Sequence, residues 1–237
     1  RSTLFPYTTL FRSERWDAES LVRWILKQNS TRNLYFHVNP MRGDLSKRGS
    51  REDVASVDWL FVDVDPRAGE PVDAERDRVL KLLAEPPGGI PRPTATIFSG
   101  GGVQAFWKLR EPVPIEGNLT EADRLGRYNL QLTIVLDGDD QHYSVDGLMR
   151  LPGTVNFPTE KKRKKGRVAA LAELVEFDPE RVFDLDQFQP APERQTADSA
   201  VAADEESLVP TGNVARIDSV EDLPDRKSTR LNSSHER

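Results

Sequence analysis

The alternation of hydrophobic and polar positions predicts interleaved helices and strands. Asp17 can cap a helix whose apolar positions continue to about Asn29. Val79, Leu82 and Leu83 mark the inner face of a second helix over residues 72–84, and a capping-box-like start at residues 120–123 predicts a third. Strands are expected at residues 33–38, 57–65, 94–98, 103–109 and 167–177, with residues 137–156 irregular.

The order of these elements defines the expected fold class. Residues 94–98 and 103–109 are separated only by a serine and three glycines, which predicts a hairpin. Helices are interspersed between the other strands rather than following each of them. We therefore expect an α+β fold with a mainly antiparallel sheet flanked by helices.

Length and composition fit one globular domain with additional ends. The chain has 237 residues, of which 37% are hydrophobic and 30% are charged. No apolar run approaches the roughly 18 residues of a membrane span, so we expect no membrane partner and a cytoplasmic location. Cysteine is absent, which excludes disulfides and thiolate metal sites. Any metal must be held by oxygen or imidazole.

The net charge of −6 comes from one segment of the chain. Residues 190–224 contain eight acidic and two basic residues, and this difference equals the whole imbalance. Such polar, acidic sequence buries too little apolar surface to order itself. We predict a disordered linker over residues 190–224.

Both ends of the chain resemble translated sequencing adapters. The matching segments are residues 3–13 (TLFPYTTLFRS) and 225–235 (DRKSTRLNSSH). We exclude residues 1–13 and 225–237 from fold prediction, as for any foreign end. The expected domain is then residues 14–189, and the natural protein is expected to continue beyond the fragment.

A pair of carboxylates stands at the end of the most apolar strand. Leu60, Val62 and Val64 should face the core, which places Asp63 and Asp65 together on the other side. Two carboxylates there repel each other unless a cation lies between them, and oxygen ligands suit Mg²⁺ or Mn²⁺. An edge strand with its acids facing water would show the same pattern.

The glycine turn is the second candidate. Gly100, Gly101 and Gly102 allow the backbone to approach a ligand closely and to present N–H groups to an anion. Gln104 should share a face with Phe106 on the next strand. A flexible hairpin without a ligand is the alternative interpretation. No Gly-Lys-Ser/Thr follows, so this is not a Walker phosphate loop.

A third candidate segment follows the last helix. Asp146 could complete a three-carboxylate site, and Arg150 could hold a phosphate in a bidentate manner. A dense basic run comes next, which is either a solvated loop or a contact for a triphosphate or a template backbone. Its members are Lys161, Lys162, Arg163, Lys164, Lys165 and Arg167.

Together, LFVDVDP, SGGGVQAFWKL and YSVDGLMRLPGTVNFPTEKKRKKGR resemble, in order, the three motifs of the archaeo-eukaryotic primase superfamily. The plasmid- and phage-encoded RepB-like primase-polymerases are the most similar group. The resemblance covers residues 33–177, and the third motif is its most specific part. It implies a sheet like that of RNA-recognition motifs, flanked by helices.

The resemblance also implies roles for individual residues. Asp63, Asp65 and Asp146 match the metal-binding catalytic carboxylates, and Ser99 matches the serine near the incoming nucleotide. Gln104 stands where the second motif usually has histidine. Glutamine can donate a hydrogen bond to a phosphate, but it carries no positive charge.

The function that the resemblance implies is template-directed nucleotidyl transfer in plasmid or phage replication, with two divalent ions, Mg²⁺ or Mn²⁺. The implied partners are nucleoside triphosphates, a single-stranded DNA template and a fused or associated helicase domain. Arg150 and the basic run would neutralise the triphosphate or contact nucleic acid.

Two other functions remain open from the sequence. A phosphatase of the haloacid dehalogenase type also begins with a strand ending in Asp-x-Asp, although Pro66 and Arg67 fit that family poorly. A catalytically weak nucleic-acid-binding module with the same fold is the other alternative, and Gln104 is the feature that suggests it.

Overall fold

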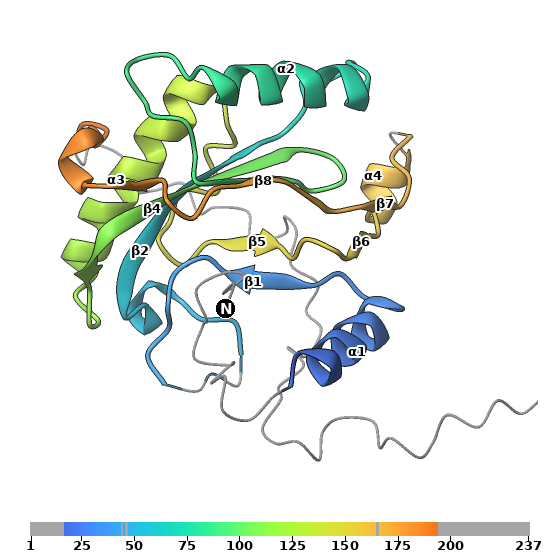
Figure 1. Ribbon diagram of the computed structural model, residues 1–237, viewed down its shortest axis with the longest axis horizontal. Helices are drawn as coiled ribbons and strands as arrows, with labels where there is room; N and C mark the ends of the chain where they lie inside the picture. The colour runs from blue at the N-terminus through green and yellow to red at the C-terminus, as the bar shows by residue number, and fades with distance from the viewer. Residues whose placement is uncertain (1–16, 44, 46, 165, 194–237) are drawn as a thin grey trace, which may run out of the picture.

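A five-stranded sheet forms the centre of the protein (Figure 1). The computed structural model describes residues 17–193, except residues 44, 46 and 165 and the side chain of Lys161. The strand order is β2–β4–β3–β8 with antiparallel pairing along this path, and β9 runs parallel beside the middle of β4. The bounds are β2 (Ser56–Val64), β3 (Ala95–Phe98), β4 (Val103–Pro114), β8 (Glu173–Phe177) and β9 (Val182–Phe183).

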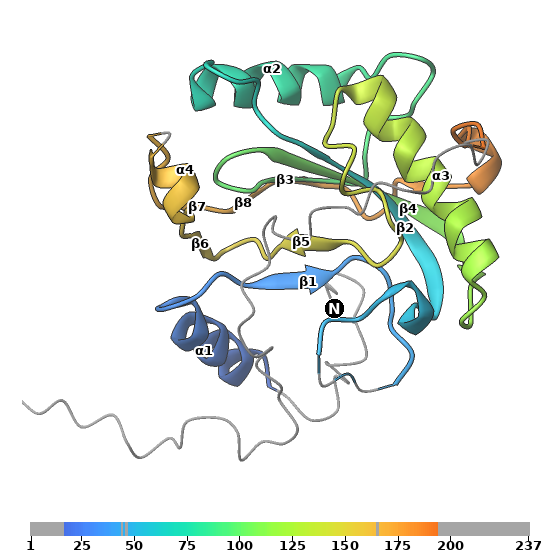
Figure 2. The ribbon, with the colours of Figure 1, turned by 180° about the vertical axis from the view of Figure 1, so that it is seen from behind.

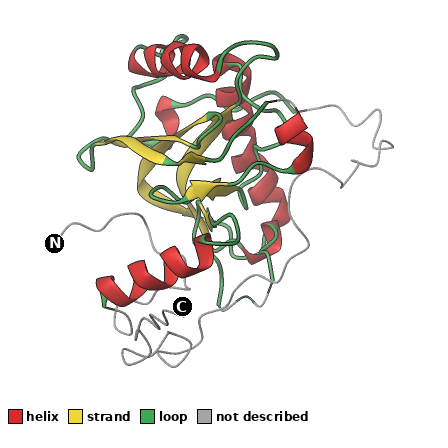
Figure 3. Ribbon diagram, turned by 90° about the vertical axis from the view of Figure 1, so that its right-hand side faces the viewer, coloured by secondary structure: helices red, strands yellow, loops and turns green. Residues whose placement is uncertain are grey.

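Two helices, α2 (Val72–Ala84) and α3 (Leu119–Leu136), cover one face of this sheet (Figure 3). Alternate β2 residues, Leu60, Val62 and Val64, point toward them and are fully buried. Val79 and Leu83 of α2 meet this face, as do several leucines of α3. Burial of apolar surface here supplies most of the driving force for folding.

A second, smaller layer covers the opposite face (Figure 2). Strands β1 (Tyr35–His37) and β5 (Leu148–Arg150) pair antiparallel beneath the main sheet. Val38 and Met149 from this layer pack against Phe61 and Phe106. The face of β2 that carries Asp63 is therefore part of a second core rather than a surface open to water.

The remaining elements lie around these layers. Helix α1 (Ala18–Asn29) begins at Asp17, whose Oδ1 accepts the Ser20 N–H at 2.8 Å. Strands β6 (Val155–Asn156) and β7 (Ala170–Leu171) pair with each other on either side of α4 (Glu160–Lys164). Two short 3₁₀ turns span Arg51–Asp53 and Leu185–Gln187.

Two asparagines satisfy backbone donors of the edge strand β2. Asn39 Oδ1 accepts N–H groups from Asp58 and Trp59, both at 2.9 Å, and Asn129 Oδ1 accepts from Phe61 at 3.0 Å. The same two amides donate to the carbonyls of Val145 and Tyr143. These bonds cover an edge that would otherwise present unpaired groups to other chains, and they tie the segment after α3 to β2.

The predicted α+β class with a mainly antiparallel sheet and flanking helices is confirmed. The bounds of α1 and α2 agree with the sequence prediction, and residues 99–102 join a hairpin as expected. The predicted start of the third helix was wrong. Asn118, rather than Thr120, caps α3 by accepting the Glu121 N–H at 3.2 Å.

The segment over residues 137–156 is less irregular than predicted, because β5 and β6 lie within it. Ala191 is buried and donates its N–H to the Arg127 carbonyl at 2.9 Å, so packed structure reaches this residue. The rest of the predicted linker from residue 194, and both adapter-like ends, lie outside the described residues. Among the described helices, none combines the length and apolarity needed to cross a membrane.

Candidate active site

Asp63 lies near the end of β2 directly opposite Gln104 of β4. Gln104 Nε2 donates to Asp63 Oδ2 at 3.4 Å, while Asp63 Oδ1 is buried and has no hydrogen-bond partner among the described residues. Burial, followed by the negative charge of Asp65, raises the pKa of Asp63 to about 7. A buried carboxylate oxygen without a partner is unfavourable unless a cation or proton joins it.

Asp65 follows β2 and is exposed, close to the glycine turn. A Cβ placed on Gly102 would lie 3.0 Å from Asp65 Oδ1 and 2.7 Å from the Val64 carbonyl. Only glycine allows this approach without a shift of the strand end. The first two candidate motifs are therefore in direct contact.

The glycine turn is held by its own serine and by two residues of the third candidate segment. Ser99 Oγ donates to the Gly102 carbonyl and accepts its N–H, both at 3.0 Å. Asn156 Nδ2 donates to the Ser99 carbonyl at 2.7 Å, and Arg167 Nη1 donates to the Gly101 carbonyl at 3.1 Å. The turn is thus fixed by the third motif, which argues against a freely flexible hairpin.

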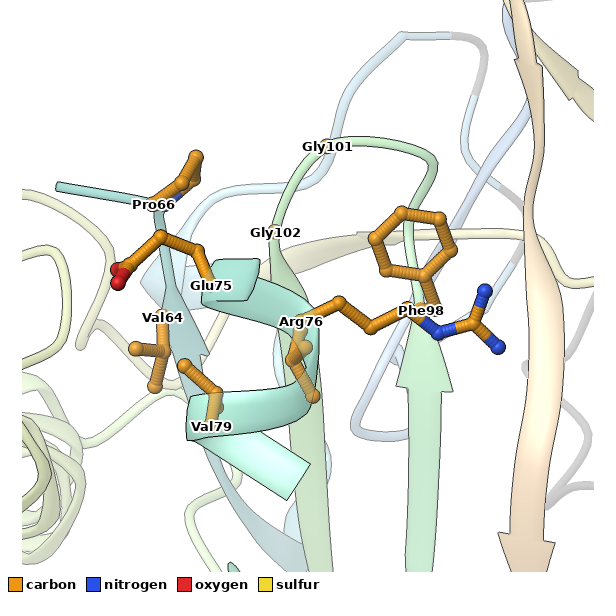
Figure 4. A pocket seen from close by; sticks show the side chains of 9 residues that line it. Val64, Pro66, Glu75, Arg76, Val79, Phe98, Gly101 and Gly102 are labelled. Atoms are coloured by element: carbon orange, nitrogen blue, oxygen red, sulfur yellow. The ribbon is translucent and has the colours of Figure 1, made fainter. Parts of the chain in front are cut away.

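A narrow hollow lies between this turn and the start of α2 (Figure 4). Its walls include Glu75, Arg76 and Phe98, and it is too narrow to admit a water molecule. Arg76 lies over the Phe98 ring, 4.5 Å from its centroid, and pairs with Glu173 at 2.7 Å. Arg76 and Phe98 therefore pack against each other on the α2 side of the turn.

Arg150 of β5 reaches the same site from the second layer. Its backbone N–H donates to Gln104 Oε1 at 3.1 Å, so the amide of Gln104 connects Arg150 with Asp63. The guanidinium lies 4.1 Å from the centre of the Tyr35 ring and donates from Nη2 to the Tyr35 hydroxyl at 2.8 Å. Nη1 is buried without a partner among the described residues, which leaves a donor for an anionic ligand.

Tyr35 is a site residue that sequence analysis did not identify. It pairs with Arg150 across the β1–β5 ladder, although the two are 115 positions apart. Asn156 was missed for the same reason, because its contact with Ser99 joins separate elements. The fixed spacing within RLPGTVN was the only available indication that this segment is structurally constrained.

Asp146 precedes β5 on the Asp63 side of the sheet. Its neighbour Gly147 lies so close to Phe61 that a Cβ would overlap the ring, and Phe61 shares its strand face with Asp63. Ser144 Oγ hydrogen-bonds to Asp146 Oδ1, and His37 Nδ1 lies 3.3 Å from the Asp146 carbonyl oxygen. Burial lowers the pKa of His37.

The three predicted carboxylates do not form a ready-made metal site. Across residues 17–193, with the gaps given above, no three His, Asp or Glu side chains are grouped closely enough to hold an ion. Asp63 and Asp65 are neighbours, and the segment of Asp146 crosses the same face. Their joint role as metal ligands remains a prediction.

The predicted basic run divides into different environments. Arg167 binds the glycine turn, Lys164 pairs with Glu160 at 3.0 Å, and Arg163 is exposed. Lys162 contributes to lowering the pKa of Asp139, a residue beside Asp63, after larger effects from His142 and the Gln141 backbone. Lys165 and the side chain of Lys161 lie outside the described part of the chain.

Comparisons with known proteins give structural similarity only. No family model and no curated protein matches the sequence. The fold is similar to the AEP domain of the cyanophage S-2L primase-polymerase, with 17% identity, 69% of this chain and 72% of that chain covered, and a TM-score of 0.48.

It is also similar to the primase RepB′, with 15% identity, 70% of this chain and 46% of that chain covered, and a TM-score of 0.43. The catalytic domain of RepB′ in complex with initiator DNA gives 16% identity, 70% coverage of both chains and a TM-score of 0.43.

Proposed function

We propose that this chain is a template-directed nucleotidyltransferase, a primase-polymerase that extends nucleic-acid strands from nucleoside triphosphates. The observation that carries the proposal is the junction at Gln104, which connects the first motif at Asp63 with the third motif at Arg150. Three segments that resemble one family's motifs in sequence thus meet at one end of the sheet.

The chemistry of the candidate ligands suits a divalent cation, although their side chains are not grouped around a single point. All candidate ligands are carboxylate oxygens, which Mg²⁺ and Mn²⁺ prefer, and Asp63 Oδ1 is buried without a protein partner. Asp63, Asp65 and Asp146 would hold the metal. When bound, it would supply activation of the attacking hydroxyl and neutralisation of the leaving phosphates.

The protein's own residues would position the nucleotide. Arg150 Nη1, which has no partner among the described residues, would donate to an anionic group of the nucleotide, and Tyr35 orients the guanidinium. The fixed turn at Ser99 brings Gly100 and Gly101 to the same end of the sheet. Gln104 is buried with both ends of its amide engaged, so it would act chiefly by placing Asp63 and Arg150. Preorganised donors of this kind stabilise charge that develops in the transition state.

The proposed setting is plasmid or phage replication, with a single-stranded DNA template and a fused or associated helicase domain as partners. Lys162 and Arg163 of α4, on the segment that follows the third motif, would contact the nucleic-acid backbone. Lys161 and Lys165 belong to the same proposed contact on sequence grounds alone.

The test is incorporation of labelled nucleotides on single-stranded DNA, with and without a primer, with Mg²⁺ or Mn²⁺. We expect metal-dependent strand synthesis that Asp63→Asn and Asp65→Asn abolish. DNA binding without synthesis would favour a catalytically weak binding module instead. Hydrolysis of simple phosphomonoesters without synthesis would favour the phosphatase alternative.

A further inference from the structure

A histidine–aspartate pair lies beside the candidate carboxylates, in the loop that follows α3. His142 Nδ1 lies 2.8 Å from Asp139 Oδ2, and the His142 N–H donates to the Asp139 carbonyl at 3.2 Å. The other oxygen of Asp139 accepts the Gln141 N–H at 3.0 Å. This compact turn fixes the imidazole relative to Asp139.

The pair is anchored directly to the strand that carries Asp63. The Asp139 N–H donates to the Asp63 carbonyl at 2.8 Å. A Cβ on Gly138 would lie 2.6 Å from Val62 Cγ2 and 2.8 Å from the Asp63 carbonyl, so the loop lies as close to β2 as a backbone can. The position of His142 beside the site is therefore set by backbone contacts.

The charges around His142 favour an imidazolium. The hydrogen bond with Asp139 raises the pKa of His142, and partial burial opposes this effect. Lys162, on α4, is the cation that acts on Asp139. Nδ1 of the imidazolium donates to the Asp139 carboxylate, so the second N–H of the ring is at Nε2. Nε2 bonds to none of the described residues.

We propose that His142 is the general acid of the nucleotidyl transfer, with Asp139 as its positioning residue. This inference rests on the proposed function. The side chain of His142 is 35% exposed while its Nδ1 stays bonded to Asp139. In the proposed role, Nε2 would reach the bound triphosphate.

The proton balance of the step is complete. The strand's terminal hydroxyl oxygen bonds to the α-phosphorus, and the bond from that phosphorus to the bridging oxygen of the β-phosphate breaks. The hydroxyl proton leaves to water, and the Nε2 proton passes to the departing pyrophosphate. Neutral His142 then takes a proton from water. General acid catalysis of this kind contributes on the order of 100- to 10,000-fold.

The experiment compares wild-type protein, His142→Gln, Asp139→Asn and the control Gln141→Ala. The exposed side chain of Gln141 bonds to Asp140 alone among the described residues. Single-turnover incorporation is measured with natural nucleotides and with β,γ-methylene and β,γ-difluoromethylene analogues, whose leaving groups differ in acidity. Nucleotide Kd and thermal unfolding are measured for each variant.

We expect His142→Gln to slow natural nucleotides by roughly 100-fold with an unchanged Kd. The loss should be largest for the methylene analogue and smallest for the difluoromethylene analogue, because a more acidic leaving group needs less protonation. Asp139→Asn should show the same trend with a smaller loss, and Gln141→Ala should match the wild type.

A loss that is equal for all three leaving groups, or no loss, would overturn the role of His142 while leaving the proposed function intact. A wild-type protein that incorporates none of the nucleotides would overturn the proposed function itself. If His142→Gln does not fold, the proposal is tested with Asp139→Asn alone. A loss that depends on the leaving group supports the role of His142, and a loss that does not depend on it overturns that role.

Discussion

Gln104 bridges Asp63 and Arg150, donating from Nε2 to the Asp63 carboxylate at 3.4 Å and accepting the Arg150 N–H at 3.1 Å. Replacing Gln104 with alanine leaves two buried polar groups without this partner. We expect Gln104→Ala to lower the free energy of unfolding by roughly 1–3 kcal/mol and to reduce nucleotide incorporation. Urea denaturation and the incorporation assay test this, with Gln141→Ala as the exposed control. Unchanged values in both assays would contradict the bridging role.

The raised pKa of Asp63 predicts how stability depends on pH. With a pKa of about 7 in the folded protein and about 4 in the unfolded chain, the folded state binds one more proton between these values. The stability that Asp63 contributes by binding this proton is fully present below about pH 4 and is lost as the pH rises through about 7. The slope is at most about 1.4 kcal/mol per pH unit.

Asp63→Asn should therefore raise the melting temperature relative to wild type at pH 8 and much less at pH 5, in the absence of divalent ions. Adding Mn²⁺ at pH 8 should stabilise the wild type but not the variant, because the ion replaces the proton. Asp77→Asn, an exposed carboxylate on α2, is the matched control. An equal change in melting temperature at both pH values would contradict the raised pKa of Asp63.

Asn156 fixes the glycine turn through its 2.7 Å bond to the Ser99 carbonyl. We expect Asn156→Ala to cost about 1 kcal/mol of stability but to reduce incorporation by a larger factor, because the turn beside Asp65 would no longer be held in place. Asn33→Ala is the control. Asn33 bonds to the backbone of Phe157, the residue that follows Asn156, and no bond joins Asn33 to the glycine turn among the described residues. Steady-state kinetics compares nucleotide incorporation by Asn156→Ala and Asn33→Ala. Equal losses of activity would show that the position of the glycine turn does not matter for function.

Arg150 and Tyr35 form a stacked, hydrogen-bonded pair. Arg150→Lys keeps the charge but loses the planar fork and the stacking, so we expect the nucleotide KM to rise about ten-fold. Tyr35→Phe keeps the ring and loses the hydroxyl, and its effect should be smaller. Arg110→Lys, which alters an exposed pair with Asp184 and a bond to the Val182 carbonyl, should leave KM unchanged. The prediction fails if Arg150→Lys behaves like this control.

Asn129 closes the edge of β2 through bonds with the Phe61 N–H and the Tyr143 carbonyl. Asn129→Ala leaves a buried N–H unpaired, so we expect a loss of roughly 1–3 kcal/mol in the free energy of unfolding. Asn33→Ala removes a similar two-bond contact at an exposed position, where water can replace the amide. Denaturation curves should show the larger loss for Asn129→Ala.

The local features of the site were predictable from the sequence because they depend on neighbouring positions. Strand periodicity placed Asp63 opposite the core face of Leu60 and Val62, and it put Gln104 on the same side as Phe106. Asp17 was recognisable as a helix cap because its partner, Ser20, is three residues away. Thr120 was misjudged because Asn118, two residues earlier, caps α3 as well as a threonine would.

Only the tertiary structure decided which distant segments meet at the site. Tyr35 reaches Arg150 through pairing of β1 with β5, Asn156 reaches Ser99, and the Asp139–His142 pair is anchored to the Asp63 carbonyl. Local propensity and periodicity act over a few residues, whereas these contacts depend on how whole layers pack. The sequence by itself determined the α+β elements and the candidate carboxylates. Packing of the second layer onto the sheet decided that Asp63 Oδ1 is buried and which side chains surround it.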